Sequence, residues 1–159
     1  RAEFGPRALG ARSILADPRS STIRDHINAS VKFREMFRPL APVILDERGH
    51  DFFQNYRTSP YMEATLSFRP STAHLVPAVV HEDGTGRVQS IRQNWNPRLY
   101  GLLIEFDRLT SIPLLLNTSY NLMGKPIAHS LADVLATFSL SGIDVLVVGD
   151  FVIKKPTHA

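Results

Sequence analysis

Three cations lie within seven residues of the segment KFREMFR, at Lys32, Arg34 and Arg38. Prolines at positions 39 and 42 disfavour a helical conformation in the residue before each, so we expect residues 32–38 to be extended. Side chains alternate between the two faces of an extended chain, which would place all three cations on one face. The opposite face would carry Phe33, Glu35 and Phe37.

Two further segments offer hydrogen-bond donors. Arg87 follows an Asp83-Gly84 turn signal and begins an alternating pattern typical of a strand. An apolar run ends in NTSYN, residues 117–121, where Ser119 and Asn121 are two positions apart and would point to the same side of a strand. A hydroxyl and an amide at a strand end suit a small polar ligand, and together with the cations they predict an oxyanion site.

Each of these residues, taken singly, also fits a less specific interpretation. The three cations of 32–38 could form a solvated charged edge in which Glu35 neutralises one of them, and residues 117–121 could simply end a strand. Cations held on one face repel each other unless an anion or a carboxylate joins them. Charge-assisted hydrogen bonds to a phosphate contribute about 1.5–3 kcal/mol each, enough for a few to outweigh that repulsion.

The composition bounds the class of protein. The 159 residues suit one domain, and the formal charge of +3 with a pI near 9.5 is too small to predict nucleic-acid binding. The chain has no cysteine, and its six histidines form no pair with metal-ligand spacing, so we expect no protein-held metal. No apolar run reaches the roughly 18 residues of a membrane span, which favours a cytoplasmic protein without a membrane partner. The chain begins at Arg1, and we expect a fragment of a longer enzyme.

Local patterns predict mixed helices and strands without strict alternation, and hence an α+β fold. Helices are expected at 7–14, 20–31, 96–111 and 130–141, with Ser130 as an N-cap and Gly142 as a stop. Buried strands are expected at 42–46 and 112–121 and further strands at 61–69 and 144–155, with a short helix or turn at 50–56. The apolar run 75–80 and the alternating run 85–91 predict a hairpin around the Asp83-Gly84 turn.

Four stretches, found in this order along the chain, resemble one family. They are EFGPRALGARSILADPR, VKFREMFRPLAP, HEDGTGRVQSI and LLLNTSYNLMGKPI. Together they are similar to the C-terminal region of the ATP-dependent O-carbamoyltransferases, the family of the nodulation-factor, cephalosporin and tobramycin carbamoyltransferases. The resemblance implies a YrdC-like domain, with an open twisted mixed β-sheet flanked by helices around a basic cavity. It further implies an interdomain connecting segment at 1–19, the YrdC-like domain at 20–159, and an actin-like N-terminal domain outside this chain.

The resemblance also implies an activity. In that family the YrdC-like domain binds carbamoyl phosphate and ATP with Mg²⁺, and forms carbamoyl adenylate, which the N-terminal domain uses to carbamoylate an acceptor hydroxyl. The expected carbamoyl phosphate ligands and catalytic groups are Lys32, Arg38 and Arg87, with Ser119 and Asn121 placed over the ligand. Arg34, Thr118 and Arg7 are expected near the nucleotide. Clustered cations offset the repulsion between two polyanions, as phosphoryl and nucleotidyl transfer require.

Two rival functions stay open. The basic concavity of a YrdC-like domain could bind RNA, although no aromatic stacking motif accompanies the cations. Alternatively, the domain could form threonylcarbamoyl adenylate from bicarbonate and threonine. The sequence names neither the acceptor nor the oligomeric state, and a homodimer is compatible with it.

Overall fold

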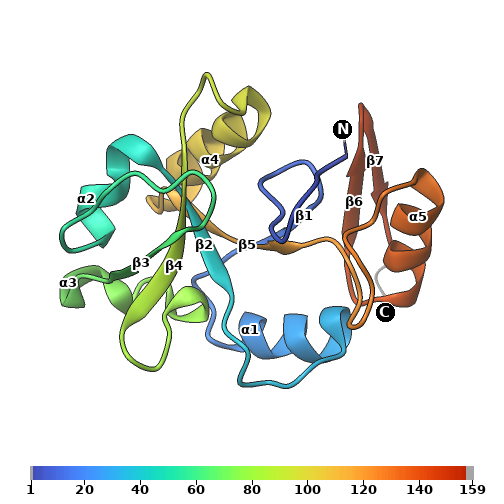
Figure 1. Ribbon diagram of the computed structural model, residues 1–159, viewed down its shortest axis with the longest axis horizontal. Helices are drawn as coiled ribbons and strands as arrows, with labels where there is room; N and C mark the ends of the chain where they lie inside the picture. Colours follow the sequence, from blue (N-terminus) through green and yellow to red (C-terminus); the bar gives the residue numbers. More distant parts are fainter. Residues whose placement is uncertain (1, 157–159) are drawn as a thin grey trace.

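A computed structural model describes residues 2–156 and confirms the α+β prediction (Figure 1). A five-stranded mixed sheet has the order β1-β5-β2-β4-β3. Its strands are β1 (Ser13–Ala16), β2 (Ala41–Leu45), β3 (Ala64–Ser67), β4 (Thr85–Ile91) and β5 (Leu114–Ser119). β2 and β4 run parallel, whereas the other neighbours are antiparallel. The starts of β2 and β4 and the end of β5 therefore meet at one edge of the sheet.

Helices and a second small sheet surround this sheet (Figure 1). The longer helices are α4 (Pro97–Thr110) and α5 (Leu131–Leu140), and the shorter ones are α1 (Thr22–His26), α2 (Gly49–Phe52) and α3 (Pro70–Ala73). Single turns are η2 (Asp46–Arg48) and η3 (Pro77–Val79), and η1 (Ile27–Lys32) is a π-helix that continues α1. β6 (Val145–Val148) and β7 (Phe151–Lys154) pair as a separate hairpin beside α5.

The apolar runs predicted as buried strands form the core. All five residues of β2 are buried, and their side chains alternate between two apolar clusters. On one face Val43 and Leu45 pack against Leu99 and Leu103 of α4. Ile44 on the other face joins the larger cluster, which extends to η1 and α5. Packing on both faces stabilises the sheet. Burying one side chain of this size, instead of leaving it exposed to water, contributes about 1.5–3 kcal/mol to the stability of the fold.

Other local predictions are also confirmed. α4 begins after Asn96, whose side chain accepts a hydrogen bond from the Leu99 amide. α5 begins at the predicted N-cap, Ser130, which forms a reciprocal capping box with Asp133. The predicted stop at Gly142 lies just beyond the end of α5, since Ser141 is the extended C-cap residue.

The predicted helix at 7–14 is wrong. Gly5 and Gly10 adopt φ values of 118° and 122°, which no residue in a right-handed helix has. The Glu3 carboxylate instead accepts hydrogen bonds from the amides of Leu9, Ala11 and Arg12, so these donors are satisfied without a helix. The chain then enters β1, which pairs with β5 and makes residues 13–16 part of the sheet.

The predicted hairpin at 75–91 is half wrong. The turn exists, since the His81 amide donates to the Thr85 carbonyl at 2.8 Å and β4 follows as expected. The apolar run before it forms η3 rather than a strand, because Pro77 has no N–H to donate to a ladder. β3 takes that place and pairs with β4 from Ala64↔Val88 to Ser67↔Thr85.

Candidate functional site

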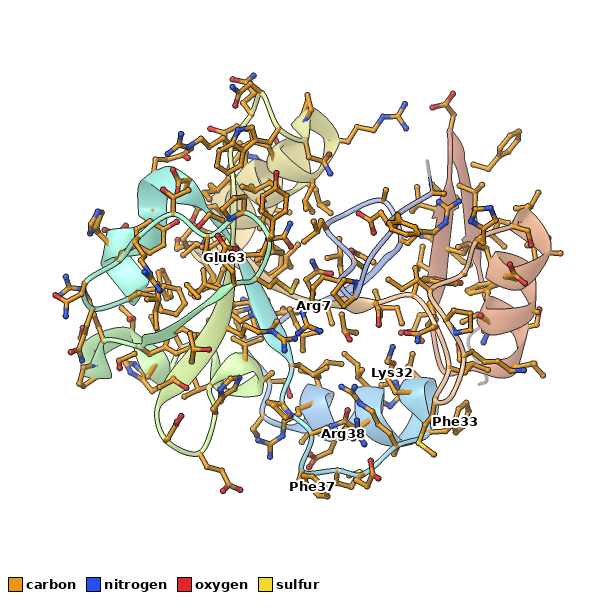
Figure 2. The ribbon with its side chains drawn as sticks, in the orientation of Figure 1. Arg7, Lys32, Phe33, Phe37, Arg38 and Glu63 are labelled. Atoms are coloured by element: carbon orange, nitrogen blue, oxygen red, sulfur yellow. The ribbon has the colours of Figure 1, made fainter. Side chains whose placement is uncertain are left out.

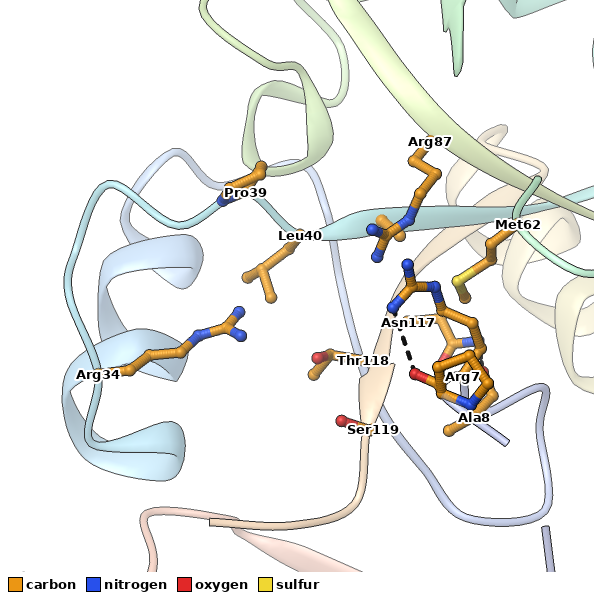
Figure 3. A pocket seen from close by; sticks show the side chains of 12 residues that line it. Arg7, Ala8, Arg34, Pro39, Leu40, Met62, Arg87, Asn117, Thr118 and Ser119 are labelled. Atoms are coloured by element: carbon orange, nitrogen blue, oxygen red, sulfur yellow. Dashed lines mark hydrogen bonds between the residues drawn. The ribbon is translucent and has the colours of Figure 1, made fainter. Parts of the chain in front are cut away.

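A cavity of about 100 Å³ lies at the sheet edge where β2 and β4 begin and β5 ends (Figure 3). Its polar lining residues are Arg7, Arg34, Arg87, Asn117, Thr118 and Ser119. Among the described residues that line it, none is acidic. Figure 3 shows the Arg7 and Arg87 guanidinium groups next to each other, with Arg34 extending toward them from the opposite wall. Three cations around a small cavity without a lining carboxylate make it a candidate oxyanion site.

The register of the sheet explains why this space exists. Ala41 on β2 lies opposite Asn117 on β5, and Val43 lies opposite Gln89 on the parallel strand β4. Arg87 is two residues before Gln89, so it projects from the same face as Ala41 and Asn117. The small Ala41 side chain separates the two longer ones, which leaves room for a ligand between Arg87 and Asn117.

Burial and the neighbouring Arg7 cation both disfavour the charge of Arg87. Its Nε is buried and has no hydrogen-bond partner among the described residues. Burial lowers the pKa of the Arg87 guanidinium, and the neighbouring Arg7 cation lowers it further. A buried donor without a partner costs about 1–3 kcal/mol. An anion in the cavity would supply both the missing acceptor and the missing charge.

Asn28 positions Arg34 and was missed by sequence reasoning. Asn28 is fully buried in η1, and its Oδ1 accepts a 2.8 Å hydrogen bond from Arg34 Nε. Its Nδ2 donates to the main-chain carbonyls of Met36 and Arg38, so one amide organises the whole loop after η1. Burial lowers the pKa of Arg34, as do the Arg38 and Arg87 cations. The sequence offered one indication of this role: Asn28 is a polar residue beside the apolar face of the helix predicted at 20–31.

The predicted extended conformation of residues 32–38 is wrong. Lys32 ends the π-helix η1, Phe33 adopts a left-handed φ of 50°, and the Arg38 amide closes a turn on the Glu35 carbonyl. The prolines disfavour helix but do not require an extended chain, and the Asn28 hydrogen bonds select a folded loop. The three cations therefore do not share one face.

Arg38 lies outside the cavity lining. Its guanidinium is half exposed and pairs with Glu35 at 2.7 Å, as sequence reasoning had allowed for one cation (Figure 2). Exposed ion pairs of this kind contribute about 0–1 kcal/mol, so the pair could open for a ligand at small cost. Contact between Arg38 and a ligand stays a prediction.

Lys32 lies behind Ser119, with only 3% of its surface exposed. Its Nζ lies 2.6 Å from the Ser119 carbonyl, 2.9 Å from the Asn121 carbonyl and 2.6 Å from Asn121 Oδ1. The Ser119 hydroxyl donates to the same Oδ1 at 2.6 Å. The side chains of Ser119 and Asn121 are thus close together, as expected. They contact each other across a turn that Lys32 stabilises, and not as alternate residues of an extended strand.

The charge state of Lys32 is set by opposing influences. Burial lowers the pKa of its amine from 10.5 to about 7, and the Arg34 cation acts in the same direction. The oxygens around Nζ favour the protonated form, because an ammonium has three N–H donors and a neutral amine has two. Lys32 is therefore charged in the folded protein below about pH 7 and loses its proton as the pH rises beyond that value.

We expect this titration to be visible in anion binding. Sulfate keeps the same charge across neutral pH, and its affinity should fall by roughly tenfold as Lys32 loses its positive charge above about pH 7. Isothermal titration calorimetry from pH 6 to 9 checks this. Lys32→Met should flatten the profile, and Lys154→Met on exposed β7 should not. A flat wild-type profile would remove Lys32 from the site.

The buried side-chain amides of Asn117 and Gln89 hold the backbone that follows Arg7 against the sheet. The sequence did not predict this role for either residue. Asn117 Nδ2 donates to the Ala8 carbonyl at 3.1 Å and to Gln89 Oε1 at 2.6 Å, while Gln89 Nε2 donates to the Leu9 carbonyl at 3.2 Å. The two carbonyls can only accept, which fixes the orientation of both amides. Arg7 is thereby held beside Arg87 despite the repulsion between them.

Within residues 2–156 no group of three His, Cys, Asp or Glu side chains is arranged to hold a metal ion. In the same part of the chain, no helix combines the length and apolar character needed to cross a bilayer.

Comparison with known proteins identifies the family of the chain. A family defined as the carbamoyltransferase C-terminus matches residues 1–155. The chain belongs to this family. The carbamoyltransferase C-terminus domain thus contains all four stretches on which the resemblance was based, and its cavity collects residues from each of them.

Several relatives of this carbamoyltransferase C-terminus domain are nodulation proteins. It is 46% identical over 160 residues to nodulation protein NolNO of Sinorhizobium fredii, covering 99% of this chain and 24% of the relative. It is 44% identical over 158 residues to nodulation protein NolO of Bradyrhizobium diazoefficiens, covering 98% of this chain and 29% of the relative. Nodulation protein U of Rhizobium tropici is 49% identical over 125 residues, covering 79% of this chain and 22% of the relative. The chain spans between 22% and 29% of the length of these curated relatives.

Proposed function

We propose that this chain is the part of an ATP-dependent O-carbamoyltransferase that binds carbamoyl phosphate and activates it as carbamoyl adenylate. The observation that carries the proposal is the meeting of Arg7, Arg34 and Arg87 in one cavity without a lining carboxylate. Membership of the carbamoyltransferase C-terminus family makes a phosphorylated carbamate the best-supported anion.

The proposal gives each polar group of the cavity a role. Arg87 and Arg34 bind phosphate oxygens of carbamoyl phosphate from two sides, because guanidinium groups match a phosphate bidentately. The Ser119 hydroxyl, held by Lys32 and Asn121, orients the carbamoyl group at the cavity wall. The residues act by positioning and charge neutralisation, since transfer between phosphates requires little covalent chemistry from the protein.

ATP is the second proposed substrate. Arg7 and Thr118 lie on the cavity lining where its phosphates would approach carbamoyl phosphate. The net reaction consumes one water: carbamoyl phosphate, ATP and water yield carbamoyl adenylate, phosphate and pyrophosphate. Mg²⁺ would come bound to the ATP phosphates, as is usual for this ion. Its chemistry there is to neutralise phosphate charge.

Transfer to an acceptor hydroxyl is proposed for a separate N-terminal domain. The curated relatives named above are roughly three to four times as long as this chain, because its matched part covers 22–29% of each. The family name places this region at the C-terminus, so the additional length would precede residue 1.

The activation step is tested by ATP–pyrophosphate exchange. We expect exchange that depends on carbamoyl phosphate, and a loss of about 10- to 100-fold in Arg34→Ala, which removes charge-assisted hydrogen bonds worth about 1.5–3 kcal/mol. Arg98→Ala is the matched control, because Arg98 is exposed on α4. Exchange that needs bicarbonate and threonine instead would assign the domain to threonylcarbamoyl adenylate formation. Full exchange in Arg34→Ala would reject the site.

A further inference from the structure

The β6–β7 hairpin exposes an apolar face that nothing in the described chain covers. Val145, Val147 and Val152 lie on one face of the hairpin, because Val147 pairs with Val152 and Val145 pairs with Lys154. Their exposed fractions are 44%, 65% and 61%. On the other face Leu146 is buried in the main core, whereas Ile153 and Phe151 are exposed. A two-stranded hairpin is marginally stable by itself in water, and an uncovered row of valines weakens it further.

A groove continues this face toward the main sheet. It has a volume of about 210 Å³, and Val145 contributes to its lining. Its walls come from β1, α1 and η1 on one side and from residues 142–145 on the other, through Ile14, Ile23, Ile27 and Ile143. Three valines beside an apolar groove offer a flat surface with a hollow, which is the shape that receives a protein partner with a protruding apolar side chain.

The segment before β1 is fastened between the main sheet and α5. The Glu3 carboxylate accepts a hydrogen bond from the Arg12 amide at 3.0 Å, and β1 begins at the next residue and forms a wall of the groove. Arg12 in turn donates to the Ala128 carbonyl just before α5, so the segment is fastened at both ends. Phe4 between them is fully exposed. Figure 1 places the N-terminus on the same side as β6 and β7. A domain joined before the described residues would therefore lie on the side of β6 and β7.

We propose that the outer face of β6–β7, together with the groove beside it, is the surface on which the N-terminal domain packs. This inference rests on the proposed function, in which such a domain precedes residue 1. The occupant is chosen for two reasons. The matched relatives carry most of their length outside this region, and the N-terminal end of the described chain lies on the side of β6 and β7 (Figure 1). The surface is apolar, which is typical of interfaces between domains that stay together.

Thiol labelling tests the proposal, because the chain contains no cysteine of its own. Val147→Cys and Val152→Cys are prepared both in the 159-residue chain and in the longer protein, and labelling by a maleimide at each position is followed by peptide mass spectrometry. Leu109→Cys on α4 is the control, since Leu109 is 70% exposed and lies away from the hairpin. We expect labelling at 147 and 152 to be about tenfold or more slower in the longer protein, with an unchanged rate at 109.

Each outcome decides the question. Equal rates at 147 in the two proteins would overturn the proposal. Protection that already exists in the 159-residue chain and disappears on dilution would assign the face to a second copy of the chain instead. The measurement needs no carbamoyl transfer, so loss of the proposed activity would leave its result intact. A reading frame that begins at residue 1 would refute the two-domain function itself.

Discussion

Replacing Arg87 with methionine is expected to weaken binding of carbamoyl phosphate by about 10- to 100-fold and, at the same time, to stabilise the ligand-free protein. The loss of affinity follows from removing charge-assisted hydrogen bonds to phosphate oxygens. The gain in stability follows from the buried Arg87 Nε, which has no partner among the described residues, and from the repulsion by Arg7. Methionine keeps an unbranched apolar stem, so the substitution leaves little empty space.

The two effects are measured separately. Calorimetric titration gives the dissociation constant, and thermal unfolding without ligand should show a melting temperature raised by about 2–4 °C for each kcal/mol gained. Arg98→Met provides the comparison for loss of an exposed arginine on α4. A variant that binds normally, or that is less stable than wild type, would show that Arg87 is a structural residue rather than an anion ligand.

The second large effect is expected from Gln89→Leu, which should act on the site through Arg7. Gln89 holds the Leu9 carbonyl and accepts from Asn117, which holds the Ala8 carbonyl. Without the Gln89 amide we expect the backbone at Ala8 and Leu9 to move away from the sheet and Arg7 to move away from the cavity. The affinity for carbamoyl phosphate should then fall about tenfold. Because the effect passes through Arg7, the double variant Arg7→Ala with Gln89→Leu should bind no more weakly than Arg7→Ala alone.

A double-mutant cycle of dissociation constants measures this coupling. Gln54→Leu is the matched control, since Gln54 also donates to a main-chain carbonyl, that of Phe68, but is absent from the cavity lining. Because Gln54 is exposed, its loss should cost less stability than the loss of Gln89, about 0.5–1.5 kcal/mol, and should leave affinity unchanged. Additive losses in the cycle would mean that Gln89 acts on the ligand independently of Arg7.

The secondary structure was predictable wherever short-range patterns decide it. The apolar runs at 42–46 and 112–119 became β2 and β5, and the spacing of leucines at 96–111 became α4. The predictions failed at 7–14 and 32–38, where a single buried or half-buried polar side chain selects the loop. Those side chains, Glu3 and Asn28, read as ordinary polar residues because their partners are main-chain groups, which the sequence does not reveal.

The candidate site was predicted in part. The sequence motifs identified Arg7, Arg34, Arg87, Thr118 and Ser119, and all five line the cavity. The alternation argument placed Arg38 with them, yet the turn from Glu35 to Arg38 puts its guanidinium outside, in a surface ion pair. Gln89 and Asn28 were missed because their contribution is to hold backbone in position, and such residues carry no charge pattern that would single them out.

By itself, the sequence determined which residue types are available: cations and small polar groups without cysteine or a metal-binding pattern, and apolar runs long enough for a sheet. It also carried the motifs that place the chain in the carbamoyltransferase C-terminus family. Only the tertiary structure decided which cations meet. Lys32 contacts Ser119 across 87 residues, and Asn117 contacts Ala8 across 109, through packing in which the register of the sheet sets each position. Burial also determines how unfavourable each unpaired cation is, because the free-energy cost of a charge rises as water is removed from around it. No local sequence pattern shows how much water surrounds a side chain.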